Sequence, residues 1–183
     1  MTLDNITGKL IEKCKRKERK AQHLLYMLSK DKLKLLAWRY CPNVHDVQDI
    51  LQNAYLKIFN SIDRFDSNKG EFEAWSAKIV INEALLLLKK KRQIPVEYFD
   101  ETPLMITDKI DFNQYSINEI KTAVKQMKIP QRVIFNMYFF DGYSYAEIAE
   151  FLNIKESSAR ANVSRAKKAF MEIWEKTDNS IAL

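Results

Sequence analysis

The sequence contains few residues that can hold a metal ion or form a disulfide bond. Its 183 residues include two cysteines, Cys14 and Cys41, and two histidines, His23 and His45. The cysteines lie far apart, and no residue near either of them completes the spacing of a zinc site. We therefore expect a reducing compartment, no metal ion and no cofactor.

Glycine and proline are also scarce, with three glycines and four prolines in the chain. Because these residues interrupt regular structure, their small number leaves room for long helices. Pro42 follows one segment of periodic apolar residues, and Pro130 and Gly142 bracket another. Apolar residues recur at spacings of three and four, as at Ile50 and Ala54, and no alternation typical of strands competes. The sequence predicts an all-α fold.

No apolar run reaches the roughly 18 residues that a membrane-spanning helix needs. The most suggestive stretch, INEALLLLKKKR at residues 81–92, is short and contains Asn82 and Glu83. The N-terminal residues lack the apolar core and the cleavage site of a signal peptide. We expect a cytoplasmic protein that does not insert into a membrane.

The charge is unevenly distributed along the chain. Thirty Lys and Arg against 24 Asp and Glu give a net charge of +6, which favours polyanionic partners, although solubility alone also explains it. Residues 1–92 hold 19 cations and 11 acids, residues 93–118 hold 1 and 5, and residues 119–183 hold 10 and 8. This predicts two small helical domains joined by a flexible, acidic linker. The apolar residues of the linker suit docking, but a surface loop is the simpler interpretation.

The C-terminal segment DGYSYAEIAEFLNIKESSARANVSRAKKAF is typical of a helix-turn-helix. Gly142 closes the preceding helix, and Ser144 with Glu147 three residues later forms a capping box for a short helix. A three-residue turn at 153–155 leads into a longer second helix. This second helix is the element that enters the major groove in helix-turn-helix proteins.

The second helix has two different faces at 100° per residue. We predict that its core face consists of Ala159, Val163, Ala166, Phe170 and Ile173. We predict that the opposite face contacts DNA through Ser158, Arg160, Ala161, Asn162, Ser164, Arg165 and Lys168. Arginine and asparagine read guanine and adenine edges, and lysine pairs with phosphates. An ordinary solvated helix face is the alternative.

The N-terminal half carries two polar rows on expected helices. The first consists of Asp46, Asp49, Gln52, Asn53 and Lys57, and it suits docking of another helix or simple solvation. In the second, Lys78, Asn82, Leu86 and Lys89 follow one another at intervals of four, four and three, and the row ends in Lys90, Lys91 and Arg92. Such a row suits a nucleic-acid contact. A core helix with a basic end that snorkels into water explains it equally well.

The order of these motifs resembles that of a bacterial extracytoplasmic-function (ECF) RNA polymerase sigma factor. The resemblance covers roughly residues 9–175 and rests on four segments in register, LLYMLSKDKLKLLAWRY, DVQDILQNAYLKIF, FEAWSAKIVINEALLLLKKKR and the helix-turn-helix. It implies a region two bundle at 1–92, a linker at 93–118 and a region four helix-turn-helix at 119–183. The implied function is to direct core RNA polymerase to promoters, without catalytic activity of its own.

The resemblance also implies roles for particular residues. Asp49, Gln52, Asn53 and Leu56 are expected to meet the β′ coiled coil of the polymerase, and region four to meet the β flap. Asn68 and Lys69 correspond to the loop that captures a base flipped from the melting strand. The positions expected at the downstream promoter box and its phosphates are Lys78, Asn82, Lys89, Lys90 and Arg92. The family positions that recognise bases of the upstream box align with Arg160, Ala161, Ser164 and Arg165. An anti-sigma factor is a further partner expected from the resemblance alone.

The sequence departs from the family pattern at several of these positions. Leu86 stands where an aspartate is usual, and Asn53 where an acid is usual. Lys155 stands where a serine usually caps the second helix, and the run SSARANV replaces a more common threonine-valine-lysine-serine-arginine run. Promoter preference therefore cannot be copied from relatives.

Two other classes of protein compete with this interpretation. A helix-turn-helix repressor leaves residues 46–92 without a role, and a nucleotidyl-transfer enzyme needs a third carboxylate beside Asp46 and Asp49.

Overall fold

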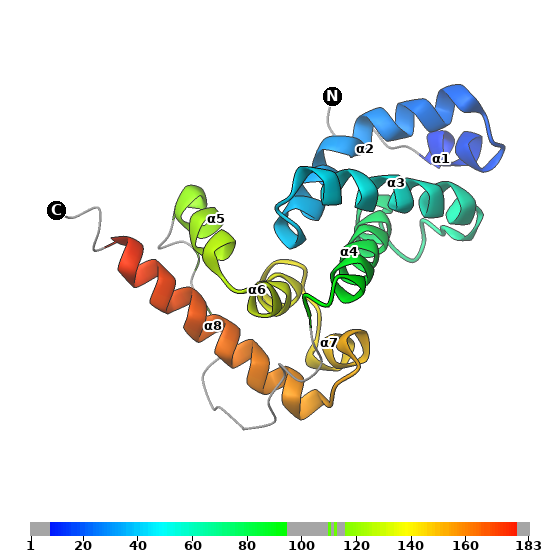
Figure 1. Ribbon diagram of the computed structural model, residues 1–183. Helices are drawn as coiled ribbons and strands as arrows, with labels where there is room; N and C mark the ends of the chain where they lie inside the picture. The colour runs from blue at the N-terminus through cyan, green and yellow to red at the C-terminus, as the bar shows by residue number, and fades with distance from the viewer. Residues whose placement is uncertain (1–7, 95–109, 111, 113–115, 179–183) are drawn as a thin grey trace. The chain divides into compact units, whose positions relative to one another are not determined.

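The computed structural model describes residues 8–94, 110, 112 and 116–178 (Figure 1). All regular structure within these residues is helical, and it forms two compact units, Met1–Lys90 and Lys91–Leu183. The predicted all-α fold of two helical domains is confirmed. Most of the predicted linker lies outside the described residues. None of the described helices is long and apolar enough to cross a bilayer.

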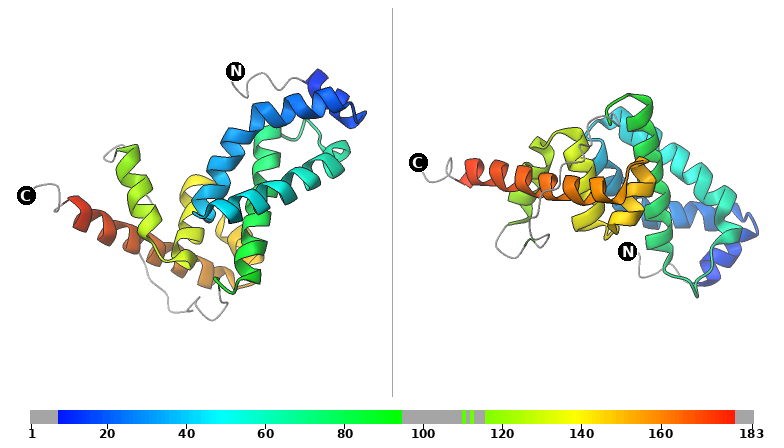
Figure 2. Two further views of the ribbon diagram at one scale, coloured as in Figure 1. Left: turned by 45° about the horizontal axis from the view of Figure 1, so that its top comes forward. Right: turned by 90° about the horizontal axis from the view of Figure 1, so that it is seen from below.

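The N-terminal unit is a bundle of three long helices with a short one added. Its elements are α1 (Gly8–Lys15), α2 (Arg19–Tyr40), α3 (Val44–Ser61), the short 3₁₀ helix η2 (Ile62–Arg64) and α4 (Phe72–Lys90). Helices α2, α3 and α4 all pack against one another, and α1 packs against α2 (Figures 1 and 2). The chain turns sharply between α2 and α3, where the Asn43 side chain caps α3 by accepting hydrogen bonds from the backbone of His45 and Asp46 at 3.0 and 3.2 Å.

The core of this bundle is built from one face of each long helix. Its fully buried large side chains are Leu25, Tyr40, Ile50, Ile58, Ile62, Ile81, Leu85 and Leu88. Each such side chain contributes about 2 kcal/mol relative to an exposed position. Two of the four consecutive leucines, Leu85 and Leu88, therefore anchor α4, and this fixes the direction in which its other faces point.

In the C-terminal unit, three short helices pack along one long helix. Its elements are α5 (Ile117–Gln126), α6 (Ile129–Phe135), the π-helical turn η5 (Asn136–Phe140), α7 (Tyr145–Leu152) and α8 (Glu156–Asp178). Helices α5, α6 and α7 each pack against α8 (Figures 1 and 2). Pro130 opens α6, where its missing N–H costs nothing, and the Phe135 and Phe170 rings stack in the core at 4.8 Å between centroids.

Candidate nucleic-acid interface

The predicted helix-turn-helix is present as α7, a turn at 153–155 and α8. Ser144 and Glu147 form the predicted capping box, with the Glu147 backbone N–H donating to the Ser144 hydroxyl at 3.2 Å. Asn153 ends α7 in the left-handed region, with φ 56°, which asparagine tolerates better than most residues. The Ile154 N–H donates to the Ala149 carbonyl at 3.0 Å. The turn is therefore held by hydrogen bonds that set the direction of α8.

The predicted core face of α8 is largely confirmed. Ala159, Val163, Ala166 and Phe170 are fully buried, and Ile173 is half-buried. These positions share one side of the helix because they are spaced by three and four residues. With this side fixed, the long cations of the helix project away from the core.

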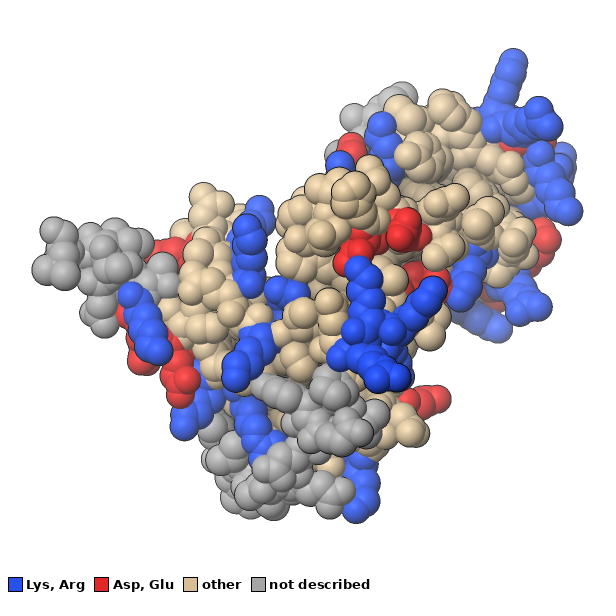
Figure 3. Space-filling view, in the orientation of Figure 1, with Lys and Arg blue, Asp and Glu red and all other residues tan. Residues whose placement is uncertain are grey.

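Arg160 and Lys168 are the most exposed of these cations, with 60% and 64% of their side-chain surface open. The Arg160 guanidinium lies 4.5 Å from the centroid of the Tyr145 ring of α7, a cation–π contact that limits its motion. Tyr145 itself stacks on Tyr138 and donates a hydrogen bond to its hydroxyl at 3.1 Å. Figure 3 shows Lys and Arg side chains spaced along α8 and gathered around the C-terminal end of α4.

The side of α8 opposite its core face was predicted to contact DNA, which requires exposure to solvent. This prediction is wrong at four positions. At most 4% of the surface is exposed at Ser158, Ala161, Asn162 and Ser164. The Asn162 amide donates to the Ser158 carbonyl at 2.7 Å, and its oxygen accepts from Arg165 at 3.3 Å. The physical reason is length: short side chains are covered easily where a helix is packed on several sides, whereas long cations reach past the cover.

The polar row on α4 lies on one exposed side of the helix, as predicted. Lys78, Leu86 and Lys89 are exposed and Asn82 is half-buried. The Asn82 side-chain oxygen is shielded from solvent and has no hydrogen-bond partner in the structure. Leu86 is 53% exposed, so one of the four consecutive leucines faces outward.

A short, ordered loop precedes α4. One Asp66 carboxylate oxygen accepts from both the backbone N–H and the side-chain amide of Asn68, at 3.0 and 3.1 Å. This turn holds Asn68 and leaves Lys69 exposed. The Phe65, Phe72 and Trp75 rings of the adjoining segments contact one another, with centroids 5.4 to 5.8 Å apart. The half-buried Trp75 ring offers an aromatic surface beside the loop.

The predicted polymerase residues lie together on the outer side of α3. Asp49, Gln52, Asn53 and Leu56 are all exposed, with Leu56 57% open. One contact near this row was missed by the sequence reasoning. The buried Glu83 of α4 forms an ion pair with Lys57 at 2.5 Å, although the same oxygen lacks a well-aligned hydrogen bond. The position of Glu83 inside an apolar run did not indicate that Lys57 is its partner. The ion pair links α3 to α4.

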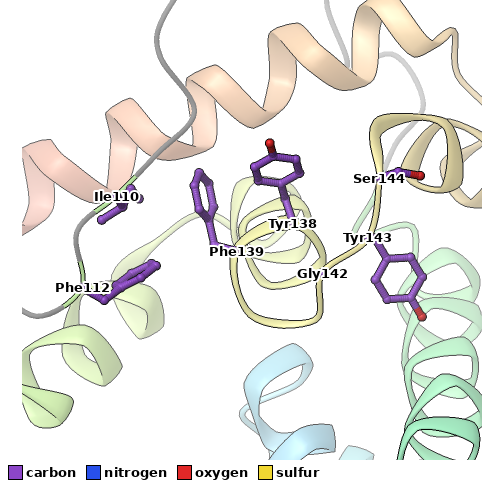
Figure 4. Close-up of a pocket in the computed structure, with 7 residues that line it drawn as sticks. All are labelled: Ile110, Phe112, Tyr138, Phe139, Gly142, Tyr143 and Ser144. Carbon is purple, nitrogen blue, oxygen red and sulfur yellow. The ribbon is translucent and has the colours of Figure 1, made fainter. Parts of the chain in front are cut away.

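A shallow cavity of about 600 Å³ lies in the C-terminal unit (Figure 4). Its lining is aromatic and apolar, with the residues Ile110, Phe112, Tyr138, Phe139, Gly142, Tyr143 and Ser144. No charged side chain lines it, and burial raises the pKa of Tyr143 to about 12. Within the described part of the chain, no three His, Cys, Asp or Glu residues come together as a metal site. The cavity therefore presents no acid–base pair.

Comparison with known protein families gives two matches in chain order. Residues 25–94 match the family described as sigma-70 region 2, and residues 117–170 match that described as sigma-70, region 4. The two matches together cover most of α2, all of α3 to α7 and the first part of α8. The chain belongs to the ECF sigma factors of the sigma-70 family. An ECF sigma factor directs RNA polymerase to promoters and initiates transcription, and this is the function of the chain.

Individual relatives agree with this assignment. The ECF RNA polymerase sigma factor SigW of Bacillus subtilis is 26% identical over 182 residues, covering 91% of this chain and 96% of the relative. The ECF sigma-E factor of Escherichia coli is 26% identical over 173 residues, covering 87% and 90%. The solved structure of the sigma factor RpoE from Bartonella quintana, in complex with the anti-sigma factor NepR, shares the fold. It has a TM-score of 0.52 at 21% identity and covers 82% and 94%.

The family accounts for the two surfaces described above. Sigma factors are known as non-catalytic transcription initiation factors, and they bind core RNA polymerase and promoter DNA. The basic side of α8 and the polar row of α4 lie in the two segments that match the DNA-binding regions of this family.

Proposed function

We propose that the two units of this ECF sigma factor read two different parts of a promoter. In this proposal residues 1–92 act as region two, at the downstream box, and open the strands. Residues 119–183 act as region four and bind the upstream box as a duplex, while residues 93–118 connect them. The observation that carries the proposal is the row on α4, because exposed cations lie on either side of the half-buried Asn82 along one side of the helix.

Strand opening needs a pocket for an extruded base and a basic path for the single strand. Separating the first bases costs a few kcal/mol, which binding of the flipped base offsets. Asn68 and Lys69 meet that base in the loop before α4, next to the Trp75 ring. Asn82 pairs with a base edge, and Lys78, Lys89, Lys90 and Arg92 follow the phosphates.

Upstream recognition rests on the cations of α8. Arg160 and Arg165 read base edges in the major groove, and Lys168 contacts a phosphate. Ser158 and Asn162 act from within the helix, because Asn162 holds the Arg165 guanidinium through its side-chain oxygen. Ala161 and Ser164 are covered in the structure, so they reach DNA only in a state in which this side of α8 is open.

The partners follow from the same proposal. Asp49, Gln52, Asn53 and Leu56 of α3 dock on the β′ coiled coil, and region four meets the β flap. The chain acts in the cytoplasm and has no enzymatic activity of its own, since the polymerase performs the chemistry. An anti-sigma factor restrains it, by analogy with the fold relatives RpoE from Bartonella quintana, solved with the anti-sigma factor NepR, and CnrH, solved with the cytosolic domain of CnrY.

Permanganate footprinting of holoenzyme on a cognate promoter tests the role of α4. Asn82→Ala should abolish most thymine reactivity in the opened region while leaving assembly with core polymerase intact, because Asn82 contributes to DNA binding alone. Asn60→Ala, an exposed asparagine at the end of α3, serves as the matched control and should open the promoter normally. Equal opening by the two variants would remove Asn82 from the mechanism.

A further inference from the structure

Arg160 of α8 is held chiefly by an aromatic ring of the neighbouring helix α7. Its guanidinium lies 4.5 Å from the centroid of the Tyr145 ring, at the distance of a cation–π contact. Its ion pair with Glu156 is longer than a hydrogen bond, at 3.8 Å, and both side chains are more than half exposed. Exposed ion pairs of this kind contribute little, because water screens them. The ring of Tyr145 is therefore the contact that fixes the Arg160 side chain.

The Tyr145 ring is itself fixed from two sides. Tyr145 is the first residue of α7, so the capping box of Ser144 and Glu147 sets its backbone. Its ring stacks on that of Tyr138 with centroids 4.9 Å apart and an angle of 14° between the planes. Its hydroxyl donates to the Tyr138 hydroxyl at 3.1 Å, and both rings are half-buried. The ring therefore determines where the guanidinium rests, since it has little freedom to follow a mobile arginine.

The π-helical turn η5 supplies the second ring of this stack. A π turn widens the helix by one residue and so changes the direction of the side chains within it, and such turns occur frequently at functional sites. The Asp141 N–H donates to the Asn136 carbonyl at 3.0 Å, five residues back along the chain, and Tyr138 lies between them. Three segments, η5, α7 and α8, therefore contribute in turn to the position of Arg160.

The contact with Tyr145 leaves the hydrogen-bonding groups of Arg160 to DNA. The face of an aromatic ring is a weak acceptor, so the five N–H groups of a guanidinium go to a stronger one, such as the O6 and N7 atoms of guanine. A carboxylate partner competes with DNA for those same groups. Arg160 also lies near the N-terminal end of α8, the part of a recognition helix that contacts base edges. The ring can therefore hold Arg160 both before and during contact with a base.

A held arginine distinguishes bases better than a mobile one. A free arginine side chain loses many rotamers when it binds a base, and this loss weakens binding. An arginine that already rests in the right place loses fewer. It also swings less readily to an alternative acceptor when the base pair is changed. Holding the side chain therefore favours the preferred base pair over the others.

We propose that Tyr145 is a positioning residue for recognition of the upstream box. It holds Arg160 so that the guanidinium meets one base pair of the box, and it acts through Arg160 without a base contact of its own. The inference rests on the proposed role of Arg160 in reading base edges. The opposite arrangement, in which the ring withholds Arg160 from DNA, predicts tighter binding when the contact is weakened.

Two variants of matched shape at position 145 test the contact. Tyr145→Phe keeps the aromatic face, whereas a trifluorinated phenylalanine at the same position has nearly the same shape and an electron-poor face. Holoenzyme is bound to promoter fragments with a randomised upstream box, and sequencing of the bound fraction gives the preference at each base pair. The fluorinated variant should show a preference about two- to fivefold weaker at the base pair that Arg160 contacts, and Tyr145→Phe should keep it. Circular dichroism melting curves of the two variants should coincide.

Two further variants assign the effect. Arg160→Ala should relax the preference at the same base pair, and Glu156→Gln, which removes the carboxylate partner of Arg160, should leave it unchanged. Equal preferences in the two variants at position 145, with relaxation in Arg160→Ala, would overturn the positioning role and leave base reading by Arg160 intact. Unchanged preference in Arg160→Ala would remove Arg160 from base reading, and the inference with it. Tighter binding by the fluorinated variant would also overturn the inference, because the ring would then withhold Arg160 from DNA.

Discussion

Leu86 is the one apolar residue in the polar row of α4 that we propose to face DNA. It lies between Asn82 and Lys89 on α4 and exposes 53% of its surface. An exposed leucine among polar neighbours is hydrated at a small cost, and a contact with a thymine methyl group removes that cost. At this position the physical chemistry therefore favours an apolar contact over a charged one.

Leu86→Asp should weaken binding of holoenzyme to promoter DNA by about tenfold, because it places a carboxylate beside the phosphates that the neighbouring lysines contact. Electrophoretic mobility shift at several salt concentrations measures the effect. Ile117→Asp introduces the same charge at a 70% exposed residue of α5 and should bind DNA like the parent chain. Unchanged binding by Leu86→Asp would mean that Leu86 does not face the promoter.

Tyr55 links helices α2 and α3 inside the N-terminal bundle. Its hydroxyl lies 2.8 Å from that of Ser29, whose own proton goes to the Leu25 carbonyl, so Tyr55 is the donor. Burial raises the pKa of Tyr55 to about 12, above its usual value of 10. Between pH 10 and 12 the unfolded chain therefore ionises this group and the folded chain does not, so the free energy of unfolding falls as the pH rises.

Tyr55→Phe should flatten this loss of stability. The variant starts about 1 kcal/mol less stable near pH 8, where the hydrogen bond to Ser29 is missing. Its free energy of unfolding should then fall less steeply than that of the parent chain between pH 10 and 12. Guanidinium titrations at pH 8 and pH 11 measure both effects, and an identical fall in the two proteins would show that Tyr55 does not cause it.

The helix-turn-helix depends on how α7 begins. The Ser144 hydroxyl accepts from the Glu147 backbone and donates to its carboxylate at 2.9 Å, which satisfies groups that the first turn leaves open. Ser144→Ala should destabilise the C-terminal unit by about 1 kcal/mol. Thermal denaturation measures the change, with Ser157→Ala, an exposed serine in the first turn of α8, as a control that should be neutral. A cost no larger than that of the control would contradict the capping role.

The sequence predicted where helices form better than it predicted which of their residues are buried by neighbouring helices. The periodicity placed Val163 and Phe170 in the core correctly, because a helix repeats every 3.6 residues wherever it packs. It could not show that Ser158 and Asn162 are also buried, since that depends on how many other helices pack around α8. The spacing of apolar residues likewise predicted helices in the N-terminal half, and only the structure shows that Leu24 faces solvent while Leu25 is buried.

Taken as a whole, the molecule joins two helical units with different tasks. The order of motifs along the chain predicted the family, because helix-turn-helix and bundle segments recur together with fixed spacing in ECF sigma factors. Contacts between residues distant in sequence, such as Lys57 with Glu83 or Tyr145 with Arg160, left no local signal. The candidate site could therefore be located on particular helices from the sequence, but its supporting contacts could not.

Run-off transcription with purified core RNA polymerase on a library of promoters tests whether this chain directs the polymerase to promoters. Transcripts should appear only when this chain is added, from a subset of templates that share an upstream and a downstream box. Omitting either box from a responsive template should abolish its transcript. No chain-dependent transcript from any template, together with tight binding of the free chain to duplex DNA, would mean that the chain is a helix-turn-helix repressor and not a sigma factor.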